Sequence, residues 1–248
     1  MKLQYLGDSK DCFKWDYHDY LTSALGYPTL NVVPMLTGFD KSGQGKTPPE
    51  DSPFREQVIA FCRDLNQHQS LERIRKLPEA TGARYCVELH RGQTYPYLTN
   101  HTRREYFSGF SAAKDQVLFL DPDNGFQPEK SFNNKHVLYS EVDAVLGQVS
   151  DTTVISAFHH FRRKSFEQDF ACIEKRIQRG YATALYWKFL MFVAVTKTKA
   201  MIEKVADINS QYAKEVPGVQ ILHRPSACHL TPERVGEVTL FGRWRLPR

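Results

Sequence analysis

The stretch Val117-Leu118-Phe119-Leu120-Asp121-Pro122-Asp123-Asn124-Gly125 joins four consecutive apolar residues directly to a turn signal. A short apolar run bounded in this way is typical of a strand buried in the middle of a parallel sheet. In open α/β sheets, ligands bind in the crevice outside the carboxyl ends of the strands. Asp, Pro, Asn and Gly are also the commonest turn residues, so a plain loop is the simplest alternative. The position directly after a buried strand favours a functional site at residues 121–125.

Strand and helix signals alternate along the rest of the chain. Apolar runs predict strands at residues 30–36, 84–89, 153–158, 182–195, 219–222 and 237–246, with one or two strands in the fourth of these segments. Amphipathic patterns and capping residues predict helices at residues 11–25, 52–65, 70–77, 102–110, 140–146, 165–180 and 198–215. This alternation predicts an α/β protein with a mostly parallel sheet and helices on both faces. The sequence contains no internal repeat or linker, so we expect a single α/β domain over residues 1–248.

The composition is that of an ordinary globular protein, since 41% of the 248 residues are hydrophobic and 25% are charged. The net charge of +5 suits a nucleic-acid partner without requiring one. Five cysteines form no C-x-x-C pair and no cluster with histidines, which predicts reduced thiols in a cytosolic protein. The first residues lack the apolar stretch of a signal peptide, and residues 181–195 are too short to cross a bilayer. We therefore expect a soluble cytoplasmic protein.

A second group of chemically active residues precedes the first predicted helix, in Gly7-Asp8-x-x-Asp11-x-x-Lys14. We expect Asp11 to be the N-cap of that helix and Asp8 to belong to the preceding turn. Lys14 then falls in the first turn, where the positive end of the helix dipole makes a cation mildly unfavourable. A lysine in that position can face an anion such as a carboxylate or a phosphate. Simple exposure to solvent is the alternative.

The basic segment His159-His160-Phe161-Arg162-Arg163-Lys164 follows the predicted strand at residues 153–158. We therefore expect it at the same edge of the sheet as Asp121. Imidazoles can transfer protons, and the three cations can contact phosphates. A basic surface turn is the alternative. The candidate nucleic-acid contacts are His159, His160, Arg162, Arg163 and Lys164, with Arg103 and Arg104 as further phosphate contacts.

A magnesium-dependent nuclease, or another phosphate-directed hydrolase, is an alternative that uses the same junction. Asp121 and Asp123 would then be Mg²⁺ ligands, and Glu88 would add a third carboxylate. Restriction-type nucleases place an acid and a Glu-x-Lys pattern on adjacent strands. Here Glu129 and Lys130 are neighbours, so their side chains point to opposite faces of an extended segment.

Three short segments resemble a known group of sequences: Gly7-Asp8-x-x-Asp11-x-x-Lys14, residues 119–125 and residues 158–162. They resemble an uncharacterised bacterial and phage protein family with FLDPDNG and HHFR motifs. That family is similar in layout to the three-Cys-motif partner proteins and to the rRNA adenine-N6 methyltransferases. The resemblance implies a Rossmann-like, class I methyltransferase-like fold that binds S-adenosylmethionine.

The resemblance also implies roles for the residues on the cofactor side. In those methyltransferases, an Asn/Asp-x-x-Asp-x-x-Lys segment on the first helix borders the S-adenosylmethionine site. Asp8, Asp11 and Lys14 match this segment, which implies that Lys14 helps to bind the methionine end of the cofactor. Gly38 follows the first predicted strand, where the family has a tight glycine turn against the cofactor.

On the catalytic side, Asp121, Pro122, Asp123 and Asn124 occupy the place of the family's Asp-Pro-Pro-Tyr. The resemblance implies that Asp121 accepts a hydrogen bond from the target amino group. Pro122 would fix the turn and help to present a backbone carbonyl. Asp123-Asn124 replaces Pro-Tyr, which removes the aromatic ring that stacks on a flipped base.

The sequence therefore leads to three hypotheses. The first is an S-adenosylmethionine-dependent methyltransferase that acts on an amino group in nucleic acid, either DNA or RNA. In that reaction Asp121 orients the amine, and proximity to the methyl donor supplies most of the remaining rate enhancement. The second is the Mg²⁺-dependent hydrolase. The third is a non-catalytic nucleic-acid-binding protein on a methyltransferase scaffold.

Overall fold

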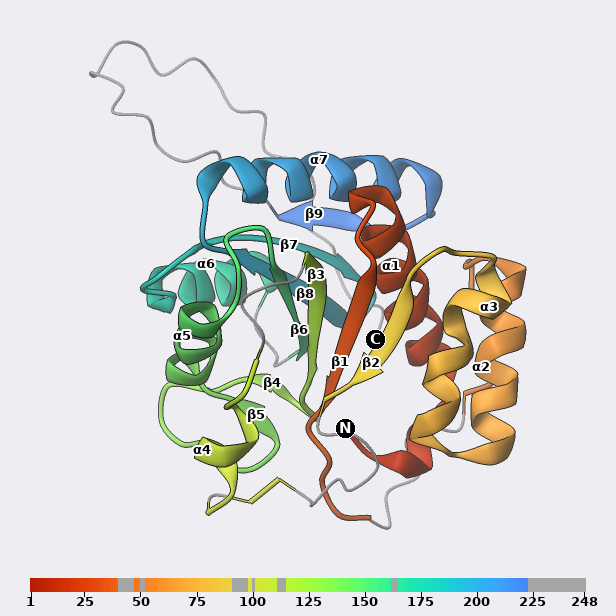
Figure 1. The fold of residues 1–248 in the computed structure, drawn as a ribbon, viewed down its shortest axis with the longest axis horizontal. Helices are drawn as coiled ribbons and strands as arrows, with labels where there is room; N and C mark the ends of the chain where they lie inside the picture. Colours follow the sequence, from red (N-terminus) through yellow and green to blue (C-terminus); the bar gives the residue numbers. More distant parts are fainter. Residues whose placement is uncertain are drawn as a thin grey trace, which may run out of the picture.

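The computed structural model describes residues 1–39, 47–49, 52–90, 98–99, 101–110, 115–161 and 165–222. Its centre is a seven-stranded sheet with the strand order β2-β1-β3-β6-β8-β7-β9 (Figure 1). These strands are β1 (Thr29–Pro34), β2 (Cys86–Leu89), β3 (Gln116–Asp121), β6 (Val154–His160), β7 (Tyr181–Trp187), β8 (Leu190–Thr196) and β9 (Gln220–Leu222). A small second sheet pairs β4 (Gly125–Phe126) with β5 (His136–Val137).

The sheet is parallel on one side and antiparallel on the other. Strands β2, β1, β3 and β6 pair in parallel, whereas β8 is antiparallel to β6, β7 to β8, and β9 to β7. Strand β7 therefore runs in the same direction as β6, and five of the seven strands share one direction. The expected mostly parallel α/β sheet is confirmed. The single apolar segment predicted at residues 182–195 is a hairpin that turns at Lys188, whose φ is 52°.

Helices cover both faces of the sheet (Figure 1). One apolar cluster joins the first face to α1 (Ser9–Leu25), α2 (Glu56–His68), α3 (Leu77–Thr81) and α7 (Lys199–Glu215), together with the 3₁₀ turn η3 (Leu71–Lys76). A second cluster joins the other face to α4 (Arg103–Tyr106), α5 (Tyr139–Gln148) and α6 (Phe166–Arg176). Side chains alternate between the two faces along β3, because Phe119 belongs to the first cluster and Leu118 and Leu120 to the second. The run at 117–120 is apolar throughout because both of its faces are buried.

Several predicted boundaries need correction. Helix α1 begins at Ser9 with Asp8 as its N-cap, because Asp8 Oδ1 accepts hydrogen bonds from the amides of Lys10 and Asp11, each at 3.0 Å. Asp11 is therefore not the cap. The helix predicted at 102–110 is only the short α4, and the helix predicted at 165–180 ends at Arg176. The strand predicted at 237–246 lies outside the described residues.

Two predicted helix caps are confirmed. Gly26 ends α1 in the left-handed conformation at φ 70°, and Ser165 caps α6 by accepting a hydrogen bond from the Gln168 amide at 3.2 Å. Within the part of the chain that the structure describes, no helix is long and apolar enough to cross a membrane.

Candidate functional site

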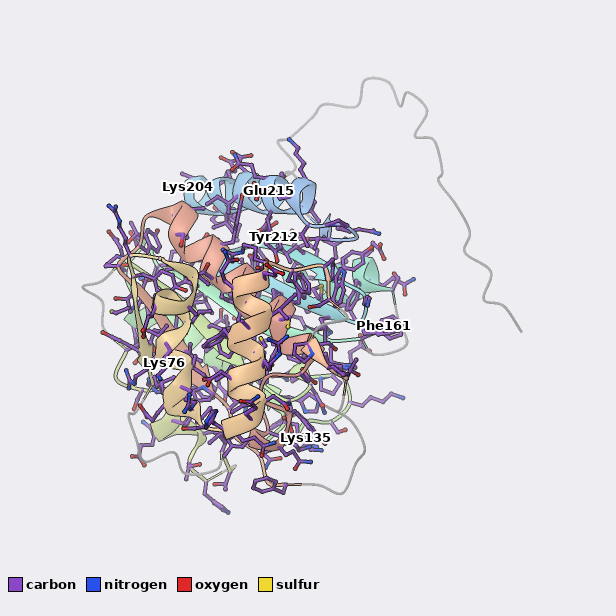
Figure 2. The ribbon with its side chains drawn as sticks, turned by 90° about the vertical axis from the view of Figure 1, so that its right-hand side faces the viewer. Lys76, Lys135, Phe161, Lys204, Tyr212 and Glu215 are labelled. Atoms are coloured by element: carbon purple, nitrogen blue, oxygen red, sulfur yellow. The ribbon has the colours of Figure 1, made fainter. Side chains whose placement is uncertain are left out.

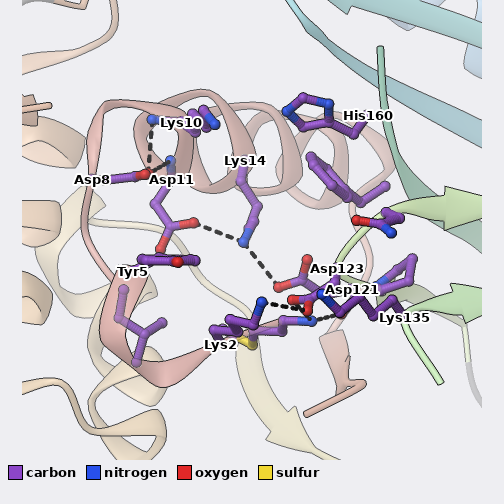
Figure 3. A pocket seen from close by; sticks show the side chains of 15 residues that line it. Lys2, Tyr5, Asp8, Lys10, Asp11, Lys14, Asp121, Asp123, Lys135 and His160 are labelled. Atoms are coloured by element: carbon purple, nitrogen blue, oxygen red, sulfur yellow. Dashed lines mark hydrogen bonds and ion pairs between the residues drawn. The ribbon is translucent and has the colours of Figure 1, made fainter. Parts of the chain in front are cut away.

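The candidate site lies where the chain changes direction across the sheet. From β1 the chain passes to β2 on one side, and it then crosses to β3 on the other side of β1. The carboxyl ends of β1 and β3 therefore border a crevice at a topological switch point, which is the usual ligand site of open α/β sheets. A pocket of about 300 Å³ lies at this edge, between the start of α1, the segment after β3 and the end of β6 (Figure 3). This is a suitable volume for a small ligand.

Lys14 and Asp121 meet in the wall of this pocket, although they are far apart in the sequence. The Lys14 Nζ lies 2.7 Å from Asp11 Oδ1 and 2.9 Å from Asp121 Oδ2 (Figure 3). All three side chains are buried. Burial alone would lower the pKa of Lys14, but the carboxylates of Asp11 and Asp121 raise it above its ordinary value. Burial raises the pKa of Asp121 despite the nearby cations. The lysine thus faces carboxylates, one of the two anions predicted from the sequence.

The spacing Gly7-Asp8-x-x-Asp11-x-x-Lys14 now has a local explanation. Gly7 has φ 78°, and a Cβ there would lie 2.1 Å from the carbonyl oxygen of Cys62, so only glycine fits. Its amide donates a hydrogen bond to Asp11 Oδ2 at 2.8 Å, which leaves Oδ1 for Lys14. Burial and the neighbouring Asp11 raise the pKa of the Asp8 cap to about 6. The motif therefore holds Lys14 against Asp121.

Asp123 faces a different set of cations. Its Oδ1 lies 2.8 Å from the Met1 ammonium, and its Oδ2 lies 3.3 Å from Lys2 Nζ and accepts a hydrogen bond from the Thr37 hydroxyl. Burial would raise the pKa of Asp123, but the ammonium and the Thr37 hydroxyl hold it below its usual value. The same ammonium donates hydrogen bonds to the backbone carbonyls of Met35, at 2.9 Å, and Asp121, at 3.2 Å. An α-ammonium group therefore lies between the ends of β1 and β3.

The backbone after Asp121 is fixed by the strand that follows it in the sheet. Asn124 donates from its amide to the Lys135 carbonyl at 2.9 Å, and its own carbonyl accepts from the His160 amide at 3.4 Å. Gly125 has φ 96°, and a Cβ there would lie 2.6 Å from the Cα of His159. Gly125 is therefore required by close packing against β6, whereas Pro122, Asp123 and Asn124 line the pocket.

The two histidines have different environments, as expected for adjacent residues of a strand. His160 lines the pocket (Figure 3). His159 is only 1% exposed; its Nδ1 accepts from the Phe126 amide at 3.2 Å, and its Nε2 lies 3.4 Å from Asp169 Oδ2. The prediction that His159 contacts nucleic acid is therefore wrong for this structure, because its ring is held inside the fold. Arg162, Arg163 and Lys164 lie outside the described residues.

Two other predicted contacts need comment. Arg103 is buried, and its guanidinium binds both carboxylate oxygens of Glu141, at 2.5 and 2.7 Å, so it fastens α4 to α5 and is not free to contact phosphate. Arg104 is exposed on the same short helix. Gly38 is exposed and is not among the residues that line the pocket.

The ligands proposed for Mg²⁺ do not come together. Among the described residues, no group of three or more His, Cys, Asp or Glu side chains could hold a metal ion. Asp121 and Asp123 are instead bonded to cations. Glu88 lies on the edge strand β2, separated from β3 by β1, and it is not part of the pocket lining.

Sequence reasoning missed several residues of the pocket, namely Met1, Lys2, Tyr5, Leu6, Lys10, Lys135 and Phe158. Lys10 lies inside the recognised N-terminal motif, so its position could have drawn attention to it. Lys135 has no local signal, because it reaches the pocket only through the pairing of β4 with β5.

A scan against protein-family models and a search of curated proteins gave no match for this chain. Among solved structures, the chain is similar to protein LPL1258 from Legionella pneumophila, which is assigned to the DUF519 family. The two sequences are 11% identical, the TM-score is 0.42, and the similarity covers 89% of this chain and 98% of that chain.

Proposed function

We propose that this protein is a methyltransferase-like protein that uses S-adenosylmethionine to methylate an amino group in nucleic acid. The observation that carries the proposal is the pocket at the switch point of a sheet with the order β2-β1-β3-β6-β8-β7-β9. Class I methyltransferases have a parallel sheet with a terminal antiparallel hairpin, whose last strand lies between its partner and the parallel strands. Strands β7 and β8 have this arrangement beside β6.

The described residues fit the methionine end of S-adenosylmethionine. The Met1 ammonium is a stand-in for the same chemical group, and it is held by the Asp123 carboxylate and by the carbonyls of Met35 and Asp121. These three acceptors would hold the α-ammonium of the cofactor, and Met1 would have to leave this position first. Gly38 and Lys14 have no direct part in this fit, because Gly38 is outside the pocket lining and Lys14 is already paired with two carboxylates.

When bound, S-adenosylmethionine supplies a methyl group on a sulfonium leaving group. The contribution of this chain is to orient the acceptor. Asp121 lies at the carboxyl end of β3, where its carboxylate can accept a hydrogen bond from an exocyclic amine. Lys14 fixes the Asp121 carboxylate by the 2.9 Å contact and keeps a positive charge beside it. We therefore assign to Asp121 the role of orienting the amine, and to Lys14 the role of positioning Asp121.

A nucleic-acid substrate agrees with the lysines that line the pocket and with the basic sequence that follows β6. His160 lines the pocket, and the next residues along the chain are Phe161 and the cations Arg162, Arg163 and Lys164. Phe161 is 38% exposed, and an exposed aromatic ring can stack on an unpaired base.

Transfer of a labelled methyl group tests this proposal. The full chain is incubated with methyl-labelled S-adenosylmethionine and, in separate reactions, with unmodified RNA and unmodified DNA. We expect incorporation into one of the two pools, and loss of about a hundredfold or more in Asp121→Asn, since the neutral amide is a weaker acceptor. Asp207→Asn, on the exposed side of α7, is the matched control and should transfer normally. Absence of transfer from the unmodified chain to both pools would contradict the proposal.

A further inference from the structure

The charges that line the pocket do not all pair with one another. Its carboxylates are Asp8, Asp11, Asp121 and Asp123, and its cations are the Met1 ammonium, Lys2, Lys10, Lys14 and Lys135. Lys14 forms ion pairs with Asp11 and Asp121, and the Met1 ammonium and Lys2 form ion pairs with Asp123. The Asp8 carboxylate caps α1 by accepting hydrogen bonds from backbone amides of its first turn. Of the cations that line the pocket, Lys10 and Lys135 have not been assigned a carboxylate partner.

Neither of these two lysines forms an ion pair within 4.0 Å among the described residues. The charge of Lys10 acts on Asp8 at longer range and helps to limit the rise of its pKa. The two side chains come from different elements, since Lys10 is in the first turn of α1 and Lys135 directly precedes β5. In Figure 3 the contact between Lys14 and Asp121 lies between them.

We infer that Lys10 and Lys135 bind the two phosphates that flank a target nucleotide in a single strand. Lysine ammonium groups without a carboxylate partner are suited to phosphate oxygens. A base inserted between the two phosphates can reach Asp121, because Lys10, Lys135 and Asp121 line the same pocket. The nucleotide enters extruded from its strand, as it must for chemistry on a base. This inference rests on the nucleic-acid part of the proposed function and does not depend on the cofactor.

The choice of a strand over a free nucleotide follows from the number of cations. One phosphate needs only one of the two lysines, whereas an internal nucleotide has a phosphate on each side. Asp121 and Asp123 already have cationic partners, so they leave Lys10 and Lys135 available for the ligand. The two lysines should therefore act on different phosphates and contribute independently.

Fluorescence anisotropy of a labelled single-stranded nonanucleotide tests the inference. We expect Lys10→Ala and Lys135→Ala each to weaken binding by about fivefold to tenfold, and each to reduce the slope of log K against log salt by about 0.7. Lys204→Ala is the control, because Lys204 is exposed on α7 and lies at the opposite end of the molecule from Lys135 (Figure 2). Lys10→Arg and Lys135→Arg keep the charge and should bind like the unmodified protein.

Neutral methylphosphonate linkages assign the contacts. Replacing the phosphate on one side of a chosen nucleotide should weaken binding to the unmodified protein, with no further loss in the variant that lacks the corresponding lysine. The other lysine should respond to the phosphate on the other side. If the unmodified protein does not bind the strand, or if Lys10→Ala and Lys135→Ala bind like Lys204→Ala, the inference is wrong.

The same variants separate this inference from the proposed function. Strand binding that depends on both lysines, without methyl transfer by the unmodified protein, would support the phosphate contacts and contradict the methyltransferase proposal. Methyl transfer with an unchanged KM for nucleic acid in Lys10→Ala and Lys135→Ala would support the proposed function and contradict the phosphate contacts.

Discussion

Replacement of Lys14 by methionine tests the arrangement of charges in the wall of the pocket. Lys14 is the cation between Asp11 and Asp121, at 2.7 and 2.9 Å, and the side chains of these three residues are no more than 10% exposed. Lys14→Met retains most of the volume but leaves two buried carboxylates without this partner. Removal of one partner from a buried ion pair typically costs about 3–5 kcal/mol. Since the free energy of unfolding of a domain is about 5–15 kcal/mol in total, we expect Lys14→Met to lose a large part of its stability.

Urea unfolding at pH 7 measures this loss as a change in the free energy of unfolding. Lys14→Met combined with Asp121→Asn should be more stable than Lys14→Met alone, because the second change removes one of the unpaired charges. Lys204→Met, on the exposed side of α7, should change the free energy of unfolding by less than about 0.5 kcal/mol.

The pH dependence provides a second readout of the same variant. Burial already raises the pKa of Asp121, and loss of Lys14 should raise it further. A carboxyl group with a raised pKa in the folded state makes the protein more stable as the pH falls. The stability difference between the unmodified protein and Lys14→Met should therefore shrink from pH 7 to pH 5. A difference below about 1 kcal/mol at pH 7, or one independent of pH, would refute the reasoning.

Three further predictions concern other parts of the structure. Gly125→Ala should lower the free energy of unfolding, measured with urea, by about 3 kcal/mol or more, because the new Cβ meets the backbone of β6. Gly82→Ala is the control: Gly82 has φ 72° and nothing lies within 4 Å of its added Cβ, so this change should cost only about 1–2 kcal/mol. Arg103→Met should cost about 3–5 kcal/mol by leaving the buried Glu141 unpaired, and adding Glu141→Gln should recover part of this loss. Burial lowers the pKa of His18 to about 3, so its contribution to stability is present above pH 6.5 and is lost as the pH falls. His18→Gln should therefore lose less stability between pH 7 and pH 4.5 than the unmodified protein, and an equal loss in both would contradict this.

The features predicted well from the sequence are those with a local cause. The run at residues 117–120 is apolar because β3 is buried on both faces, and the turn that follows it lines the pocket. Lys14 faces Asp11 and Asp121, which is one of the two environments considered from the sequence, although α1 begins at Ser9 and Lys14 lies beyond its first turn. Gly26 and Ser165 act as the helix signals indicate.

The features that were missed depend on contacts between distant segments. The insertion of β8 between β6 and β7 is a matter of strand pairing, which leaves no pattern inside either strand. Lys135 reaches the pocket through the pairing of β4 with β5. The wrong prediction that His159 contacts nucleic acid could have been avoided from the local sequence. Strand β6 continues to His160, and alternation along a strand turns one of two adjacent histidines inward.

Calorimetric titration with S-adenosylmethionine measures directly whether the pocket binds the cofactor. We expect one binding site per chain for the unmodified protein. We also expect the affinity to be weakened by about thirtyfold or more in Asp123→Asn, because this change removes the charged acceptor for the α-ammonium group. No binding by the unmodified protein, or equal affinity in Asp123→Asn, would contradict the claim that the pocket at the ends of β1 and β3 is a cofactor site.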